Sequence, residues 1–170
     1  AKKVEQALEN EPRNIEVLNA AIMVNDRLWR ADHAVAIGEY VQERDPLNPG
    51  GQWNLARAYL NSGAYDLAEQ TYRVREAITG SGGRTSWAIG LALLLQDKPG
   101  EALQYFDEHV VDDALRLHGT TLAFHDLGRA EDAKSALAEL LATEGNDYNH
   151  YWLVGTAYAW IGAADEAFAF

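Results

Sequence analysis

The chain has 170 residues, 48% of them hydrophobic, and carries a formal charge of −12 from 26 acidic and 14 basic residues. This length and composition suit a folded domain, and no run of about 18 apolar residues indicates a membrane span. Binding to nucleic-acid phosphates needs clustered Lys and Arg, which so acidic a chain does not supply. We therefore expect neither a nucleic-acid partner nor membrane insertion.

Cysteine is absent, so disulfides and thiolate metal sites are excluded. The lack of cysteine does not choose between a reducing and an oxidising compartment. We expect a cytoplasmic protein, although the composition is also compatible with a periplasmic one.

Eleven amphipathic helices are predicted from apolar residues at helical spacing, separated by turn residues rich in Gly, Pro and Asn. In chain order they cover residues 2–10, 15–26, 31–44, 50–62, 65–79, 84–96, 99–110, 113–126, 130–143, 148–161 and 164–170. The "SGG" stretch at 81–83 lacks the Lys and the preceding strand of a phosphate-binding loop, so it is expected to be a turn.

A spacing of 34 residues, shortened once to 31, organises these helices into pairs. It joins the alanines at Ala34, Ala68, Ala102, Ala133 and Ala167, and a column of small residues at Ala56, Gly90, Thr121 and Gly155. Small residues let two helices approach closely. In the second repeat we expect Ala68 to lie at such a contact and Glu69 to face solvent.

The repeats resemble the tetratricopeptide repeat (TPR) family, most clearly in "WNLARAYLNSGAYDLAEQTY" and "YWLVGTAYAWIGAADEAF". The resemblance implies an all-α fold, a right-handed α-α superhelix or solenoid of antiparallel helix pairs with about five TPR-like repeats. A single array would fill residues 1–170. Its parts would be the second helix of a preceding repeat at 1–14, repeats at 15–48, 49–82, 83–113 and 114–147, and an incomplete last repeat at 148–170.

The register also indicates a piece of a larger protein, because neither end carries the polar capping helix that a solenoid needs. The last segment, "HYWLVGTAYAWIGAADEAFAF", is similar to the closing repeats of bacterial arrays fused to winged-helix regulators or nucleotide cyclases. We therefore expect a fragment of a bacterial protein.

In the family, the first helix of each pair lines a concave groove, and the resemblance assigns three columns of this sequence to that face. They begin at Asn19, Met23 and Asp26 and recur in each later repeat. The predicted peptide groove consists of Asn19, Met23, Trp53, Arg57, Trp87, Leu91, His118, Leu122, His125, Trp152 and Thr156.

Each groove tryptophan has a second interpretation, in which it only packs between helices. If the column binds a ligand, Trp53, Trp87, His118 and Trp152 should be partly exposed, with Arg57 as the main cationic contact. Trp29 and Trp160, which lie outside the column, are expected to be packing residues.

Catalysis has little support in the sequence. The five histidines, His33, His109, His118, His125 and His150, show no metal-binding spacing such as HExxH. His118 and His125 would lie about 10 Å apart along one helix, and we expect both to be solvated. No catalytic residue, metal or cofactor is therefore predicted.

The predicted function is a protein–protein interaction scaffold that presents a concave, partly aromatic groove to a peptide or a partner domain. Only Arg57 and Arg84 could hold a C-terminal carboxylate, so a carboxylate clamp is not expected. The alternative is a sensory or self-association module of a larger bacterial signalling or regulatory protein, in which this chain forms a homodimer.

Overall fold

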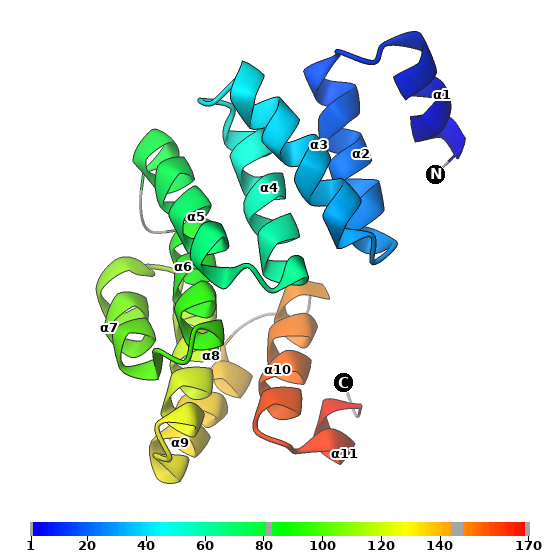
Figure 1. Cartoon of the computed structure of the whole chain (residues 1–170). Helices are drawn as coiled ribbons and strands as arrows, with labels where there is room; N and C mark the ends of the chain where they lie inside the picture. Colours follow the sequence, from blue (N-terminus) through cyan, green and yellow to red (C-terminus); the bar gives the residue numbers. More distant parts are fainter. Residues whose placement is uncertain (1, 81–82, 144–147, 169–170) are drawn as a thin grey trace. The chain divides into compact units, whose positions relative to one another are not determined.

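The computed structural model describes residues 2–80, 83–143 and 148–168. These residues contain eleven helices (Figure 1): α1 (Lys2–Asn10), α2 (Ile15–Arg27), α3 (Ala31–Arg44), α4 (Pro49–Ser62), α5 (Tyr65–Thr79), α6 (Arg84–Leu95), α7 (Pro99–His109), α8 (Asp113–Asp126), α9 (Ala130–Ala142), α10 (Tyr148–Trp160) and α11 (Ala164–Ala167). All predicted helices are confirmed, and the first ten have ends within one residue of those expected.

Two predictions fall partly outside the described residues. The expected turn at 81–83 includes residues 81 and 82, and the expected last helix extends over 169 and 170. Within the described part, that helix, α11, ends at Ala167.

The contacts between helices divide the chain into two compact units, Ala1–Gly80 and Ser81–Phe170. In unit 1, consecutive helices pack against each other from α1 through α5, and α2 also packs against α4. In unit 2, α6 to α9 pack consecutively, while α10 contacts α8, α9 and α11, and α6 also packs against α8. We call α2, α4, α6, α8 and α10 the A helices, because each is the first helix of a pair.

One turn geometry joins the two helices of every pair. Its central residue is Trp29, Gly63, Asp97, Gly128 or Gly162, and all five have a positive φ, between 57° and 83°. In the second pair the N–H of Gly63 donates to the Leu60 carbonyl at 3.2 Å, and the N–H of Ala64 donates to the Tyr59 carbonyl at 2.9 Å. The other four turns repeat both bonds. This is a Schellman-type helix end, whose left-handed residue is normally glycine.

Two of these five turn residues, Trp29 and Asp97, are not glycine, and Trp29 is the bulkier. The prediction that Trp29 is a packing residue is wrong, because its side chain is 86% exposed. The left-handed turn carries the indole into solvent instead of between two helices.

Small residues fix the spacing of helices as expected. Ala68 is fully buried, which confirms its predicted place at a helix contact. In unit 2, the Phe106 ring from α7 lies against Gly90 on α6 and Gly119 on α8, and a Cβ at either glycine would overlap the ring. The large Phe106 side chain on α7 thus fits because glycine, which has no side chain, stands opposite it on α6 and α8.

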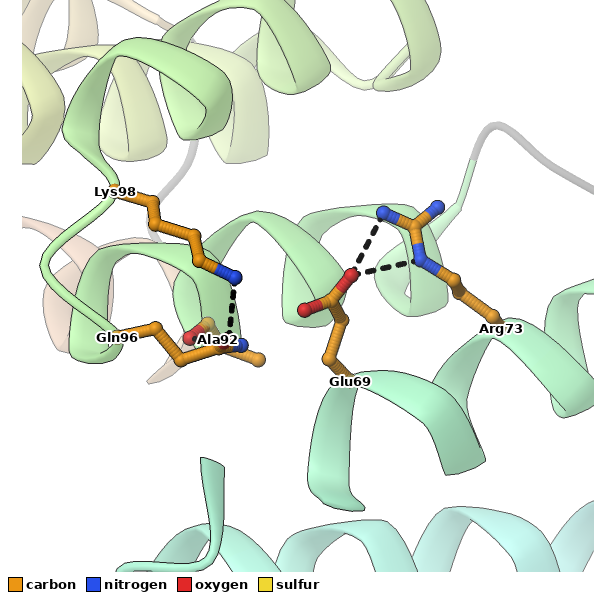
Figure 2. A network of polar contacts seen from close by, with 5 residues as sticks. All are labelled: Glu69, Arg73, Ala92, Gln96 and Lys98. Atoms are coloured by element: carbon orange, nitrogen blue, oxygen red, sulfur yellow. Dashed lines mark hydrogen bonds and ion pairs between the residues drawn. The ribbon is translucent and has the colours of Figure 1, made fainter. Parts of the chain in front are cut away.

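Glu69 does not face solvent freely, so that prediction is wrong. Its side chain is 16% exposed, and its Oε1 accepts hydrogen bonds from Nε and Nη2 of Arg73, each at 2.9 Å (Figure 2). A second local network, in unit 2, runs from Lys98 Nζ to Gln96 Oε1 at 2.8 Å and from Gln96 Nε2 to the Ala92 carbonyl at 3.1 Å (Figure 2). The Glu69–Arg73 pair is one helical turn apart, a spacing that stabilises helices modestly.

Candidate functional site

The residues predicted to line a groove all lie on A helices, and they divide between the two units. Unit 1 contains Asn19 and Met23 on α2, and Trp53 and Arg57 on α4. Unit 2 contains Trp87 and Leu91 on α6, His118, Leu122 and His125 on α8, and Trp152 and Thr156 on α10. The A helices of each unit pack against one another, so each unit has its own A-helix face.

Four of the predicted residues meet in unit 2 through a chain of hydrogen bonds. Trp87 Nε1–H donates to His118 Nδ1 at 3.2 Å, so Nδ1 is the unprotonated nitrogen of the imidazole. The other nitrogen, Nε2, then donates to Thr156 Oγ1 at 3.0 Å. The Thr156 hydroxyl in turn donates to the Trp152 carbonyl at 2.8 Å. Three A helices are thereby joined by side-chain hydrogen bonds in which each donor has an acceptor.

The exposure of this cluster differs from the prediction. Trp87 is 6% exposed and His118 is 2% exposed, so neither has the partial exposure expected of a ligand contact, and Trp87 follows the packing interpretation. They are covered because α6, α8 and α10 pack together at this point. Trp152 is the exposed member, at 40%.

Two buried rings support the indole of Trp152. Its centroid lies 6.0 Å from that of His118 in a stacked arrangement and 5.8 Å from that of Trp87 in an edge-on arrangement. Aromatic pairs at such distances add stability beyond the area they bury. The exposed indole of Trp152 therefore packs against two buried rings.

Burial controls the charge of His118. Desolvation lowers the pKa of His118 from 6.5 to about 3, so the imidazole is neutral at neutral pH. This agrees with its accepting a hydrogen bond from Trp87. The expectation of a solvated His118 is wrong, whereas His125 is exposed as predicted. Of the two leucines in the predicted set, Leu91 is half-buried and Leu122 belongs to the core.

In unit 1 the A helices α2 and α4 are joined by an ion pair. Asp26 on α2 is buried and accepts hydrogen bonds from Arg57 Nε at 2.8 Å and from the Asn61 side-chain amide. The Arg57 side chain is 29% exposed, and its Nη2 is buried without a hydrogen-bond partner. Much of the charge of Arg57 is therefore met by Asp26 within the unit.

The remaining residues of the unit 1 face are partly accessible. Trp53 is half-buried, with its ring centroid 5.3 Å from that of Tyr72 and 5.2 Å from the Arg75 guanidinium carbon. Met23 is 36% exposed, and Asn19 is half-buried with an Oδ1 that has no hydrogen-bond partner within the described part of the chain.

Sequence reasoning missed the partners that hold these residues. The sequence places Asp26 on the groove face but does not identify its ion pair with Arg57 or its hydrogen bond with Asn61. A signal did exist, because Asp26 and Arg57 carry opposite charges and occupy neighbouring groove columns of adjacent repeats, 31 residues apart. Trp160, expected to pack, is 36% exposed and donates a hydrogen bond from its indole to Asp126 at 2.9 Å.

Two broader properties concern only the residues that the structure describes. No three His, Asp or Glu side chains among them are grouped closely enough to hold a metal ion. None of the described helices has the length and apolar character required to cross a membrane.

No protein-family model matches the chain, and no curated protein matches it in sequence. Solved structures match it closely in fold. A thermophilic TPR protein of Thermus thermophilus has a TM-score of 0.72 at 18% identity, over 92% of this chain and 87% of that one. A TPR protein from Parabacteroides merdae has a TM-score of 0.70 at 18% identity, over 99% and 68%.

YrrB, described as a TPR protein with an unusual peptide-binding site, has a TM-score of 0.62 at 15% identity, over 98% of this chain and 87% of its own. Identities this low establish a shared fold and nothing finer. The chain is therefore an all-α array of TPR-like helix pairs.

Proposed function

We propose that the chain is a protein–protein interaction scaffold whose main contact surface is the A-helix face of unit 2. The observation that carries the proposal is the setting of Trp152, which is 40% exposed yet packs against two buried rings. A preorganised aromatic side chain loses little conformational entropy on binding, and tryptophan is enriched among residues that dominate binding energy.

The partner proposed for this face is a peptide segment or a domain that presents an apolar side chain to Trp152. The half-buried Leu91 on α6 and the exposed His125 on α8 lie on helices of the same face and would contribute apolar and polar contacts. The described peptide-binding site of YrrB, which shares this fold, supports a peptide as the partner class. A formal charge of −12 argues against nucleic acid.

The unit 1 face is proposed as a second, more polar contact surface. Met23 and Trp53 would supply apolar contact, and the unpartnered Oδ1 of Asn19 would accept a hydrogen bond after a small rearrangement. Arg57 already forms an ion pair with Asp26, so we assign it a supporting role in any contact with an acidic group.

Binding can be tested with peptides selected from a phage-displayed library on the immobilised wild-type chain. Calorimetry would then compare wild type with Trp152→Ala, for which we expect affinity to fall at least tenfold. Trp160→Ala is the matched control, because Trp160 lies on the same helix and is similarly exposed, at 36%. Unchanged binding by Trp152→Ala, or an equal loss in the control, would contradict the proposal.

Self-association is the competing role, with a second copy of the chain as the partner. Light scattering on the purified chain over a range of concentrations separates the two. A dimer that dissociates in Trp152→Ala would favour self-association through this face, whereas a monomer at every concentration would remove that alternative.

A further inference from the structure

The turn between α2 and α3 has a residue that its backbone geometry disfavours. Trp29 has φ = 57°, in the position that the equivalent turns fill with Gly63, Gly128 and Gly162. Left-handed backbone is strained for any residue with a Cβ and especially unusual for a bulky one. A strained residue calls for a compensating interaction or a functional reason.

Among the residues that the structure describes, none packs closely enough over Trp29 to bury its side chain. Its side chain is 86% exposed, and Leu28 beside it is 47% exposed. Asp97, which holds the same position in unit 2 with φ = 60°, is a small polar residue that tolerates left-handed backbone better. The indole at position 29 thus places a large apolar surface in solvent at a cost in backbone strain.

Two arginines lie close to Trp29 in the sequence. Arg27 and Arg30 are both exposed, and neither guanidinium has an ion-pair or hydrogen-bond partner among the residues that the structure describes. Four other arginines are paired: Arg57, Arg73, Arg116 and Arg129. Arg27 and Arg30 therefore place two cations on this turn, and the nearest acidic residues in sequence are Asp26, which is buried and paired with Arg57, and the exposed Asp32.

We propose that the turn formed by Arg27, Leu28, Trp29 and Arg30 is a docking site for an acidic segment of a partner protein. The two guanidinium groups would each bind a carboxylate of that segment, and Trp29 would bury its ring against an apolar side chain between the carboxylates. Tryptophan and arginine are the residue types most enriched at binding hot spots. Guanidinium and carboxylate form strong, directional hydrogen bonds.

The small apolar surface of the turn favours a protein segment over a lipid surface. Of its four residues only Leu28 and Trp29 are exposed apolar side chains, far fewer than on the apolar face of a helix that lies in a membrane interface. The site uses residues of unit 1 that have no part in the face built around Trp152. Either site can therefore exist without the other.

The docking role of Trp29 can be tested with a substitution that also relieves the backbone strain at this position. Trp29→Gly removes the indole but gives the turn its favoured residue, so the thermal unfolding midpoint should rise by a few degrees while binding is lost. Asp97→Gly is the matched control, since it relieves the same backbone position in unit 2 and leaves the docking turn intact. Arg27→Gln with Arg30→Gln removes both cations without altering the left-handed residue.

The probe is a fluorescein-labelled peptide, Asp-Glu-Leu-Phe-Glu-Asp, with a second peptide in which Asn and Gln replace the acidic residues. Fluorescence polarisation should show binding of the acidic peptide to wild type and to Asp97→Gly. We expect affinity at least tenfold weaker for Trp29→Gly, for the double arginine variant and for the neutral peptide.

Four results would overturn the proposal. They are no binding of the acidic peptide to wild type, undiminished binding to Trp29→Gly, and an equal loss in Asp97→Gly. The fourth is Trp29-dependent co-sedimentation with phosphatidylserine–phosphatidylcholine vesicles without peptide binding, which would assign the turn to a lipid surface instead.

Discussion

Trp53 in unit 1 and Trp87 in unit 2 occupy the same repeat position, 34 residues apart, yet their surroundings differ. Trp53 is half-buried and touches Tyr72 and Arg75 from α5, the second helix of its own pair. Trp87 is 6% exposed, because His118 and Trp152 from the next two A helices of unit 2 close over it. Within unit 2, the burial of Trp87 thus depends on side chains from the A helices that follow it.

The units also differ in how they join their A helices. Unit 2 uses a neutral chain through Trp87, His118 and Thr156, whereas unit 1 uses the charged pair of Asp26 and Arg57. A buried neutral network depends on complete hydrogen bonding, and a partly exposed ion pair depends on charge. The two faces should therefore respond differently to truncation, acid and charge removal.

The largest expected difference is between the two tryptophan truncations. Trp87→Ala should reduce the free energy of unfolding by about 3–5 kcal/mol, because it opens a cavity and leaves His118 Nδ1 without a donor. Trp53→Ala should cost about 1–2 kcal/mol, since part of that ring already lies in solvent. Urea denaturation of both variants measures the difference.

Hydrogen exchange on the same variants locates the effect. Trp87→Ala should lower the protection of amides in α6, α8 and α10 first, because these helices share the cluster. Equal losses for the two variants would show that the distinction between the units has no energetic basis.

Acid should also separate the two units. The folded-state pKa of His118, about 3, lies below its ordinary value of 6.5, so the unfolded chain binds a proton more readily. The contribution of His118 to stability is fully present above about pH 6.5 and is lost as pH falls toward 3, by about 1.4 kcal/mol per pH unit. The equivalent residues of unit 1, Asn19 and Trp53, do not titrate.

His118→Gln is the control for this pH dependence. Its side-chain amide can accept from Trp87 and donate to Thr156 without titrating. Urea midpoints measured between pH 4.5 and 7.5 should converge for wild type and variant at the acid end. Parallel curves would rule out His118 as the source of the dependence.

The sequence predicted the fold because the information lies in local periodicity. Apolar spacing located the helices, and the 34-residue phase of residues such as Ala34 and Ala68 placed them in pairs. The small residues carried packing information as well, since Ala68 is fully buried.

The site was less predictable because exposure depends on contacts between repeats. The residues next to Trp87 in the sequence do not indicate that His118 and Trp152 cover it. The sequence alone therefore could not decide whether Trp87 packs between helices or contacts a ligand. The exposure of Trp29 could not be predicted for a different reason. The sequence places it 34 residues before Gly63, but only the backbone shows that this position requires left-handed φ.

Packing around Phe106 gives a smaller effect that is specific to unit 2. Gly90→Ala should cost about 1–3 kcal/mol, because its Cβ would overlap the Phe106 ring in a fully buried site. Phe106→Leu in the same chain should recover part of that loss by making room. Gly100→Ala, at an open position on α7, should leave the urea midpoint no lower than that of wild type, because alanine is the better helix former.

The smallest effect concerns the ion pair of unit 1. Asp26→Asn should reduce stability by about 1–2 kcal/mol, because Arg57 loses its partner but can still reach water through a side chain that is 29% exposed. A double-mutant cycle with Arg57→Gln isolates the energy of the pair from the other bond of Asp26, to Asn61. Glu131→Gln is the exposed control, since the side chains of Glu131 and Lys134 are 87% and 70% exposed, and no change in urea midpoint is expected. A coupling energy near zero for Asp26 and Arg57 would mean that unit 1 is joined by packing alone, and the contrast with the hydrogen-bonded cluster of unit 2 would then rest on Trp87 and His118.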